Sequence, residues 1–308
     1  MMKTIGEEPM INKTAAVMVT YNRKDLLQKS IEALCAQTCR NVLDILIIDN
    51  ASTDGTKESI EKYLEKNEIQ YFNTGANLGG AGGFCFGIKL AAEMGYDTIW
   101  ILDDDTLPSP SALEELLKKD QEYGDKYGFL SSKVLWKDGS ICTMNIQKET
   151  KWKRINEFNN DKQIQYASFV SLFIRTDTVK QLGLPYKEFF IWADDWEYTR
   201  RISKKKPCFY ISSSVVTHWC GSNVGADIVS TPTDRINRFN YMYRNDVVLY
   251  RQDGLEGLFY LTIRNIIHKI KVIWKAEGKR EKLSIIRKGT QAGKKFYPII
   301  EYPENNDT

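Results

Sequence analysis

The stretch Thr98-Ile99-Trp100-Ile101-Leu102-Asp103-Asp104-Asp105-Thr106-Leu107-Pro108 decides the fold. It begins as an apolar run with the length and composition of a buried strand, and this run ends abruptly in three adjacent carboxylates. Neighbouring carboxylates repel one another unless a cation or a proton lies among them. The pattern therefore predicts a cation site at the end of a strand. A solvated acidic turn ahead of a helix is the alternative.

Strands and helices alternate on the N-terminal side of these aspartates. Four such strands joined by three helices predict a right-handed βαβ array, and hence a parallel sheet. The predicted strands are Ala15–Thr20, Val42–Ile48, Ile69–Asn73 and the run before Asp103, with helices after Arg23, near Thr56–Lys66 and near Gly83–Met94. Because ligands bind at the carboxyl ends of strands in open sheets, the segments that follow the strands should share one rim.

The second half of the chain changes character. Its strand patterns, with a polar loop at residues 148–161, predict a mixed or antiparallel extension of the sheet. The expected elements are strands over 129–136, 141–146, 164–174, 208–211 and 215–217, a helix over 195–205, and helices from residue 233 onward. The predicted fold class is α/β, a mainly parallel sheet with a mixed extension and a C-terminal helical region. We divide it into a catalytic domain, residues 1–230, and a basic helical region, residues 231–308.

Composition limits the class of protein. With 42% hydrophobic and 27% charged residues, the 308-residue chain fits a soluble globular protein. No apolar run approaches the ~20 residues that span a bilayer, and residues 1–10 lack the pattern of a secretory signal. The six cysteines form no CxxC pair, so we expect reduced thiols in the cytoplasm and no structural zinc.

Positive charge is concentrated near the C-terminus. Residues 251–300 contain 12 Lys and Arg against 4 Asp and Glu, whereas residues 1–250 contain 31 against 33. Leu255–Ile273 places apolar residues at helical spacing among lysines and arginines. This helix either lies in a membrane interface beside anionic lipid, or packs on the catalytic domain or on a second subunit of a homo-oligomer. A nucleic-acid partner is not predicted, because no recognition motif is present.

A glycine-rich segment, Gly75-Ala76-Asn77-Leu78-Gly79-Gly80-Ala81-Gly82-Gly83, precedes the third helix. Its bare backbone suits close approach to a phosphate or ribose at a helix N-terminus. It matches neither the G-x-G-x-x-G fingerprint nor a Walker loop. The alternative is a tight strand-to-helix turn.

Three motifs together resemble those of family 2 glycosyltransferases with the GT-A fold, over about residues 14–220. The motifs are Val19-Thr20-Tyr21-Asn22-Arg23, Ile48-Asp49-Asn50-Ala51-Ser52-Thr53-Asp54-Gly55 and Leu102-Asp103-Asp104-Asp105. The resemblance implies a UDP-sugar donor and a divalent cation, Mn²⁺ or Mg²⁺. It implies that Asp103 and Asp105 hold the metal, that Asp104 turns toward the ribose, and that His218 completes the metal shell.

A narrower resemblance is to bacterial galactofuranosyltransferases, with rhamnosyltransferases next. It rests on Asn77–Phe84, Ile191-Trp192-Ala193-Asp194-Asp195-Trp196-Glu197-Tyr198, Thr217-His218-Trp219 and Tyr241-Met242-Tyr243-Arg244-Asn245. Ala193, inserted between Trp192 and the aspartates, departs from the family pattern. A structural role is the alternative for His218, and His268 is expected at the surface.

The remaining site residues follow from this resemblance and from the chemistry of sugar transfer. An acceptor alcohol must lose its proton as the new bond forms, so a carboxylate base is needed, and we predict Asp195. A helix N-terminus favoured by the dipole also explains these acids. Trp192, Asp194, Trp196 and Glu197 are predicted to bind the acceptor. The predicted nucleotide-binding residues are Thr20, Tyr21 on the base, Arg23 on the phosphates, Asp49 on the uracil imide, Asn77, Gly80 and Asp104.

These residues predict a metal-dependent inverting glycosyltransferase. The expected reaction transfers galactofuranose from UDP-galactofuranose to a lipid-linked glycan acceptor, at the cytoplasmic face of the membrane, in cell-surface polysaccharide synthesis. Two alternatives stay open: a rhamnosyltransferase that uses dTDP-rhamnose, and a non-catalytic nucleotide-sugar-binding protein.

Overall fold

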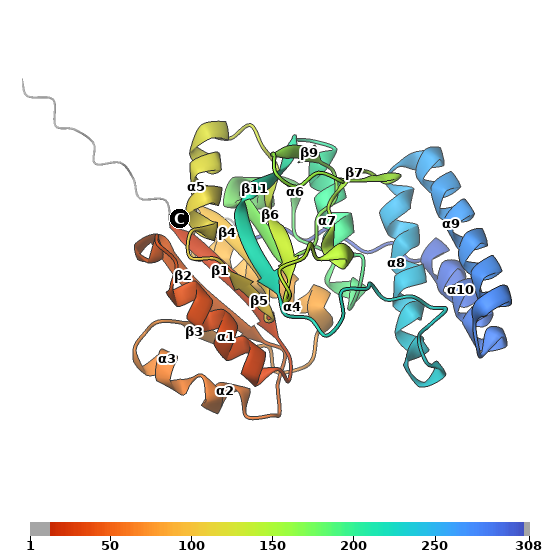
Figure 1. Ribbon diagram of the computed structural model, residues 1–308, viewed down its shortest axis with the longest axis horizontal. Helices are drawn as coiled ribbons and strands as arrows, with labels where there is room; N and C mark the ends of the chain where they lie inside the picture. Colours follow the sequence, from red (N-terminus) through yellow and green to blue (C-terminus); the bar gives the residue numbers. More distant parts are fainter. Residues whose placement is uncertain (1–12, 305–308) are drawn as a thin grey trace, which may run out of the picture.

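The computed structural model describes residues 13–304 (Figure 1). Residues 1–10, for which no secretory signal is predicted, lie outside this range. Within it, nine strands form one sheet in the order β3-β2-β1-β4-β10-β6-β11-β5, and β9 pairs with β11. The strands are β1 (Thr14–Thr20), β2 (Leu43–Asp49), β3 (Gln70–Asn73), β4 (Thr98–Asp103), β5 (Thr106–Pro108), β6 (Phe129–Trp136), β9 (Lys162–Ile164), β10 (Ser171–Arg175) and β11 (Cys208–His218).

The predicted parallel array is present. β1 pairs in parallel with β2 and with β4, and β2 pairs in parallel with β3. The register sets Thr20 beside Asp49 and Val19 beside Asp103. The carboxyl ends of β1, β2 and β4 therefore lie level with one another, so the segments that leave them share one rim.

Helices cover both faces of the sheet (Figure 1). Along β1, Met18 packs with α1, α3 and α5 on one face, while Val17 packs with α4, α6 and α7 on the other. Because successive strand residues point to opposite faces and both faces are covered, every residue of β1 is buried, and Ala15 to Val19 are all apolar. The helices are α1 (Lys24–Cys35), α2 (Thr56–Ser59), α3 (Glu61–Glu65), α4 (Gly79–Glu93), α5 (Ala112–Tyr123), α6 (Thr176–Leu182) and α7 (Asp194–Ser203).

The mixed extension differs in detail from the predicted strands. β10 runs antiparallel to β4 and β6, and β11 runs parallel to β6. Residues 141–146 form a single bridge and a 3-10 turn, not a strand. The predicted strand over 164–174 is split between β9 and β10, and the two strands predicted after residue 208 are one strand with an irregularity between Ile211 and Val215. The polar segment at 148–161 contains the hairpin of β7 (Lys148–Thr150) and β8 (Lys153–Arg154).

Three helices follow the sheet and lie together at one side of it (Figure 1): α8 (Phe239–Arg251), α9 (Gly254–Lys275) and α10 (Lys279–Lys294). After α10 the chain returns to α4, where the backbone N–H of Glu304 donates to Glu93 Oε1 at 3.0 Å.

The division of the chain at residue 230 stays a prediction. No helix in the described part of the chain combines the length and hydropathy needed to cross a bilayer. His268 is half-buried and bonded to Tyr243 at 2.9 Å, so its expected surface position is wrong.

Candidate active site

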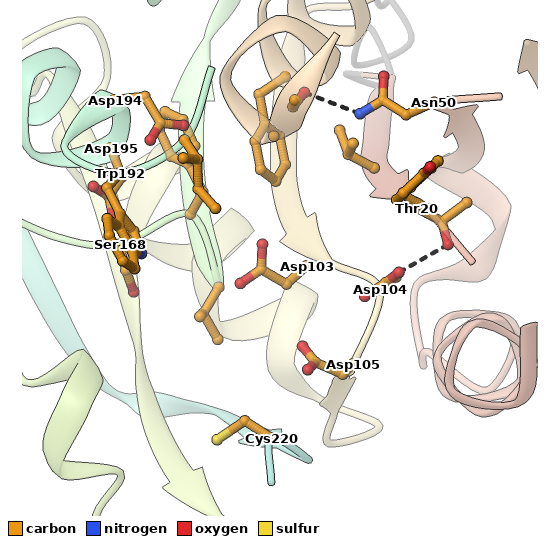
Figure 2. Close-up of a pocket in the computed structure, with 18 of the residues that line it drawn as sticks. Thr20, Asn50, Asp103, Asp104, Asp105, Ser168, Trp192, Asp194, Asp195 and Cys220 are labelled. Atoms are coloured by element: carbon orange, nitrogen blue, oxygen red, sulfur yellow. Dashed lines mark hydrogen bonds between the residues drawn. The ribbon is translucent and has the colours of Figure 1, made fainter. Parts of the chain in front are cut away.

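A cavity of about 580 Å³ opens where β1, β2 and β4 end (Figure 2). Two groups of residues, each with adjacent aspartates, face each other across it. We call Asp103, Asp104 and Asp105 the β4 wall, and Trp192, Asp194 and Asp195 the α7 wall. The predicted rim therefore becomes one side of a cleft whose other side comes from residues about ninety positions later.

Arg23 contacts two of the three aspartates of the β4 wall, and Thr20 contacts one of them. Asp104 accepts a hydrogen bond from Thr20 Oγ1 at 2.8 Å and one from Arg23 Nη1 at 3.1 Å. The same guanidinium nitrogen lies 2.7 Å from Asp105 Oδ2. Arg23 is the N-cap residue of α1, so the segment after β1 carries the cation that neutralises the end of β4.

The predicted metal ligands are brought together. Ligand atoms of Asp103, Asp105 and His218 all lie within 4.8 Å of one another. Asp105 Oδ1 is buried and, in the described part of the chain, has no hydrogen-bond partner, although His218 Nε2 lies 3.0 Å away. Two carboxylates and an imidazole with an unsatisfied buried oxygen fit a hard divalent cation such as Mn²⁺ or Mg²⁺.

Electrostatics at the β4 wall also favour a cation. Burial and the neighbouring Asp105 raise the pKa of Asp103 to about 7, against the opposing effect of His218. Burial acts to lower the pKa of His218, but its contacts with Asp105 and Cys142 raise this pKa to about 11. A cation among these groups would favour the ionised form of Asp103 and the neutral form of His218.

The predicted nucleotide-binding residues reach the cavity, with one exception. Thr20, Tyr21, Asn77 and Gly80 line it, and Tyr21 is 44% exposed. Asp49 does not line it. Its carboxylate is buried and accepts hydrogen bonds from the backbone N–H of Ser52 at 2.8 Å and from Tyr71 Oη at 2.6 Å. Asp49 therefore holds the turn after β2 in this structure, and a contact with uracil stays a prediction.

The glycine-rich segment is more helical than predicted. α4 begins at Gly79 instead of near Gly83, so most of its glycines belong to the first turns of the helix. A Cβ at Gly79, whose φ is +73°, would lie 2.1 Å from Phe190 O, and one at Gly83 would lie 2.5 Å from Val19 Cγ1. These glycines serve close packing, while Gly80 has open space around its Cα.

The α7 wall is held by an unusual backbone. Phe190, Trp192 and Ala193 all have positive φ, between +63° and +68°, a conformation that costs energy in residues with a side chain. The Asn245 amide, fully buried in α8, donates to the carbonyl oxygens of Phe189, Ile191 and Trp192 at 3.0, 3.1 and 2.9 Å. The inserted Ala193 takes the left-handed conformation just before α7, so both aspartates enter the first helical turn.

Burial dominates the chemistry of the α7 wall. It raises the pKa of Asp194 to about 6, and burial with the neighbouring Asp194 raises the pKa of Asp195 well above its usual range. Asp195 Oδ1 accepts the backbone N–H of Trp196 at 2.7 Å. A carboxylate poorly solvated and near a second carboxylate binds a proton strongly, which is the property required of a base.

Two predicted acceptor residues do not reach the cavity. Glu197 is buried, and both of its oxygens lie 3.1 Å from guanidinium nitrogens of Arg201. Trp196 packs under Lys148, whose Nζ lies 3.8 Å from the ring centroid. Asp194 and Asp195 begin α7 and line the cavity, whereas the next two side chains point to other sides of the same helical turn. An acceptor contact of Trp196 or Glu197 therefore stays a prediction that this arrangement does not support.

A family comparison agrees with this geometry. The model of glycosyl transferase family 2 matches residues 15–183, more than half of the chain. The chain belongs to this family. The galactofuranosyltransferase GlfT1 of Mycobacterium tuberculosis is 30% identical to this family 2 glycosyltransferase over 267 residues, which cover 81% of this chain and 86% of that protein.

Solved structures show the fold of this family 2 glycosyltransferase. S. aureus TarS 1–349 aligns with a TM-score of 0.56 and 13% identity, covering 92% of this chain and 72% of that chain. The mannosyltransferase PcManGT of Pyrobaculum calidifontis, solved with GDP-Man and Mn²⁺, aligns with a TM-score of 0.54 and 12% identity, covering 93% and 76%. The predicted GT-A fold with a C-terminal helical region is confirmed.

Sequence reasoning missed several residues that line the cavity of this family 2 glycosyltransferase. Asn50 follows Asp49 at the end of β2, and its Nδ2 donates to Gly79 O at 2.9 Å. Its position directly after a strand was a usable signal. Asn145 and Ser168, joined by a 3.0 Å hydrogen bond, have no such signal, because they reach the cavity from irregular segments.

Proposed function

We propose that this family 2 glycosyltransferase transfers galactofuranose from UDP-galactofuranose to a hydroxyl group of a glycan acceptor, with inversion at the anomeric carbon. One observation carries the proposal: a cation-binding wall and a wall of proton-binding carboxylates face each other across one cavity of about 580 Å³. The relative from M. tuberculosis, a galactofuranosyltransferase, supports the choice of sugar.

The β4 wall is the donor side in this proposal. Asp103, Asp105 and His218 would hold Mn²⁺ or Mg²⁺, which neutralises charge on the departing diphosphate when it is bound. Arg23 approaches the same charge from the end of β1, while Thr20 keeps Asp104 directed toward the ribose. Tyr21, Asn77 and Gly80 line the space for the nucleotide.

The α7 wall is the acceptor side. As the acceptor oxygen attacks the anomeric carbon, the bond from that carbon to the diphosphate oxygen breaks on the opposite face, so the configuration inverts. The hydroxyl proton passes to the carboxylate of Asp195, whose orientation is fixed by the backbone N–H of Trp196. Asp194 and the ring of Trp192 line the same side and orient the acceptor.

A donor screen tests the reaction. The full chain is incubated with Mn²⁺, a lipid-linked or synthetic glycan acceptor, and a panel of UDP-sugars together with dTDP-rhamnose, and products are read by mass and linkage. We expect transfer from UDP-galactofuranose with inverted configuration. Transfer from dTDP-rhamnose alone would favour the rhamnosyltransferase, and donor binding without any transfer would favour a non-catalytic binding protein.

The proposal places the acceptor on a lipid at the cytoplasmic face of the membrane. α9 exposes apolar side chains along one face, with Leu255 87%, Phe259 62% and Trp274 77% exposed. A groove of about 480 Å³ between α9 and α10 joins apolar residues to Lys269, Arg287 and Lys294. Apolar side chains beside a cluster of cations suit the interface of an anionic membrane in cell-surface polysaccharide synthesis.

Vesicle binding tests this surface. We expect the full chain to co-sediment with vesicles containing anionic lipid, to release in high salt, and to bind less when Phe259 and Trp274 become serine. Met94→Ser, an exposed apolar residue at the end of α4, is the matched control and should bind as the wild type does. A concentration-dependent dimer lost in the same double variant, without vesicle binding, would assign the surface to a second copy of the chain.

A further inference from the structure

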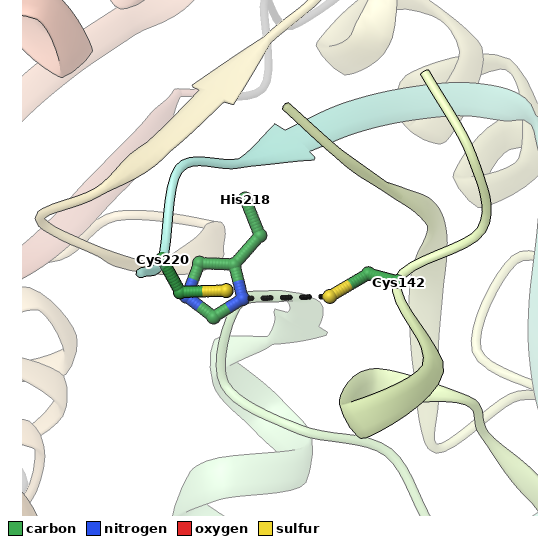
Figure 3. Close-up of side chains that lie close together, drawn as sticks. All are labelled: Cys142, His218 and Cys220. Atoms are coloured by element: carbon green, nitrogen blue, oxygen red, sulfur yellow. Dashed lines mark hydrogen bonds between the residues drawn. The ribbon is translucent and has the colours of Figure 1, made fainter. Parts of the chain in front are cut away.

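A second group of possible ligand atoms surrounds His218 and includes two cysteine thiols (Figure 3). Cys142 and Cys220 come from segments far apart in the sequence, yet their Sγ atoms and a ring nitrogen of His218 all lie within 4.8 Å of one another. Cys142 Sγ is 3.8 Å from Nδ1 of His218. Neither thiol forms a disulfide. Cys220 lines the cavity, so a cation can reach this group from solvent.

These ligand atoms are softer than those of the β4 wall. Met144 Sδ lies 3.5 Å from Cys220 Sγ and adds a thioether to the two thiols and the imidazole. Thiolate and imidazole ligands favour Zn²⁺ and other soft cations, whereas carboxylate-rich sets favour Mn²⁺ and Mg²⁺. The two groups therefore differ in the class of metal that they select, although they share one histidine.

We propose that Cys142, His218 and Cys220 form a second cation site, for a soft divalent cation such as Zn²⁺, that competes with the cation of the β4 wall. The competing part rests on the proposed function, which puts a hard cation on Asp103, Asp105 and His218. Both thiols bind as thiolates, so each gives its proton to solvent as the soft cation enters.

The competition follows from the two nitrogens of one ring. Nε2 of His218 faces Asp105 at 3.0 Å, while Nδ1 faces Cys142 and lies 2.8 Å from Asn145 Oδ1. A neutral imidazole has one lone pair and one N–H. If Nε2 binds the hard cation, Nδ1–H donates to Asn145. If Nδ1 binds the soft cation, Nε2–H points at Asp105, and the β4 wall loses one ligand.

Cadmium titration tests the site without any donor or acceptor. Cd²⁺ bound to thiolate gives a charge-transfer absorption in the ultraviolet, so CdCl₂ is added to the full-length chain. We expect one Cd²⁺ per chain, and about a 100-fold loss of affinity in C142S and in C220S. C39S removes a half-buried thiol outside this group and is the matched control. A signal that survives both C142S and C220S, or that only C39S removes, would overturn the site.

Manganese binding, followed by electron paramagnetic resonance, tests the competition. We expect Cd²⁺ to lower Mn²⁺ affinity about tenfold or more in the wild type, and Mn²⁺ to lower Cd²⁺ affinity by the same factor. In C142S and C220S, Cd²⁺ should lower Mn²⁺ affinity no more than Mg²⁺ does, because Mg²⁺ competes only for the carboxylate ligands. Simultaneous binding with unchanged affinities would overturn the competition. Absence of Mn²⁺ binding beside a normal Cd²⁺ titration would instead contradict the proposed metal of the β4 wall and leave the soft site standing.

Discussion

The two walls of the cavity carry the same chemical group in opposite electrostatic settings. On the β4 wall, Arg23 and His218 lie against the carboxylates, and the contact with His218 and the charge of Arg23 lower the pKa of Asp105 despite its burial. On the α7 wall, neither Asp194 nor Asp195 forms an ion pair within residues 13–304, and burial raises both pKa values. The surroundings of the β4 wall favour ionised Asp105, whereas those of the α7 wall favour protonated carboxyl groups.

The walls also differ in how the chain holds them. The β4 wall follows directly from a buried strand whose neighbours are set by a continuous parallel register. The α7 wall depends on three residues with positive φ and on Asn245, more than fifty residues away in α8. The β4 wall is therefore a local consequence of the sheet, whereas the α7 wall needs the C-terminal helices.

The largest effect should come from removing one carboxylate on each wall. We expect Asp195→Asn to reduce transfer by about 100- to 10,000-fold, because the base is lost. Asp105→Asn should be at least about 1,000-fold slower, because a metal ligand and a partner of Arg23 are lost together.

UDP binding should distinguish the roles of the two walls more clearly than the rate of transfer does. Calorimetry of UDP in the presence of Mn²⁺ should give wild-type affinity for Asp195→Asn and weak binding for Asp105→Asn. Equal loss of UDP binding in both variants would contradict the division of the cavity into a donor side and an acceptor side. Full transfer by either variant would remove that residue from the mechanism.

The next effect tests how the α7 wall is held. Asn245→Leu removes three hydrogen bonds to the segment that carries Trp192 and Asp195. We expect kcat to fall by about 10- to 100-fold through misplacement of the base, while KM for the donor changes little. Asn237→Ala, an exposed asparagine nearby, is the control. A KM effect with unchanged kcat would contradict this positioning role. Circular dichroism and the melting temperature check that the variant is folded.

The contrast between the walls explains what the sequence could reveal. The strands and aspartates of the β4 wall were predictable, because apolar runs and the residues that end them are close in the chain. The position of Asp195 at the cavity was predictable through the resemblance of its segment to a family motif, while its role as the base stays a prediction. The burial of Glu197 against Arg201 and the turn role of Asp49 were not, because they depend on which side of a helix or turn meets the core.

Long-range contacts explain the remaining differences. The segment at 141–146 has strand-like composition, but it finds only a single bridge to β6, at Leu135 and Ile141, and folds into a 3-10 turn that brings Asn145 to the cavity. The Cys142 and Cys220 pair lacks any motif spacing, since the two thiols meet only through the arrangement of β11 and this turn. Such contacts leave no periodic trace in the sequence.

A smaller effect concerns the packing beneath the β4 wall. A Cβ at Gly83 would lie 2.5 Å from Val19 Cγ1 and 2.9 Å from Asn50 Nδ2. We expect Gly83→Ala to lower the free energy of unfolding by about 1–3 kcal/mol, because α4 must move away from β1. Gly80→Ala, on the same helix with open space around it, should leave stability unchanged or raise it by about 0.5–1 kcal/mol. Urea unfolding measures the free energy of unfolding of both variants. Equal effects would contradict the close packing at Gly83.

The smallest effect is the stability cost of the α7 wall itself. Burial raises the pKa of Asp194 to about 6, above its value of about 3.9 in an unfolded chain. The folded protein therefore binds this proton more tightly, so the carboxyl group favours folding while it is protonated, and this contribution is lost as the pH rises through about 6.

Asp194→Asn keeps the shape of the side chain and cannot ionise. We expect it to raise the free energy of unfolding at pH 8 by about 1–2 kcal/mol, and the gain to vanish near pH 4, where Asp194 is protonated in the folded protein. Urea unfolding at both pH values measures it, with Asp125→Asn on an exposed turn as the control. An increase in the free energy of unfolding that does not depend on pH would mean that burial does not raise the pKa of Asp194. A gain at high pH alone would mean that the α7 wall gives up stability to keep an ionisable group where the acceptor must lose its proton.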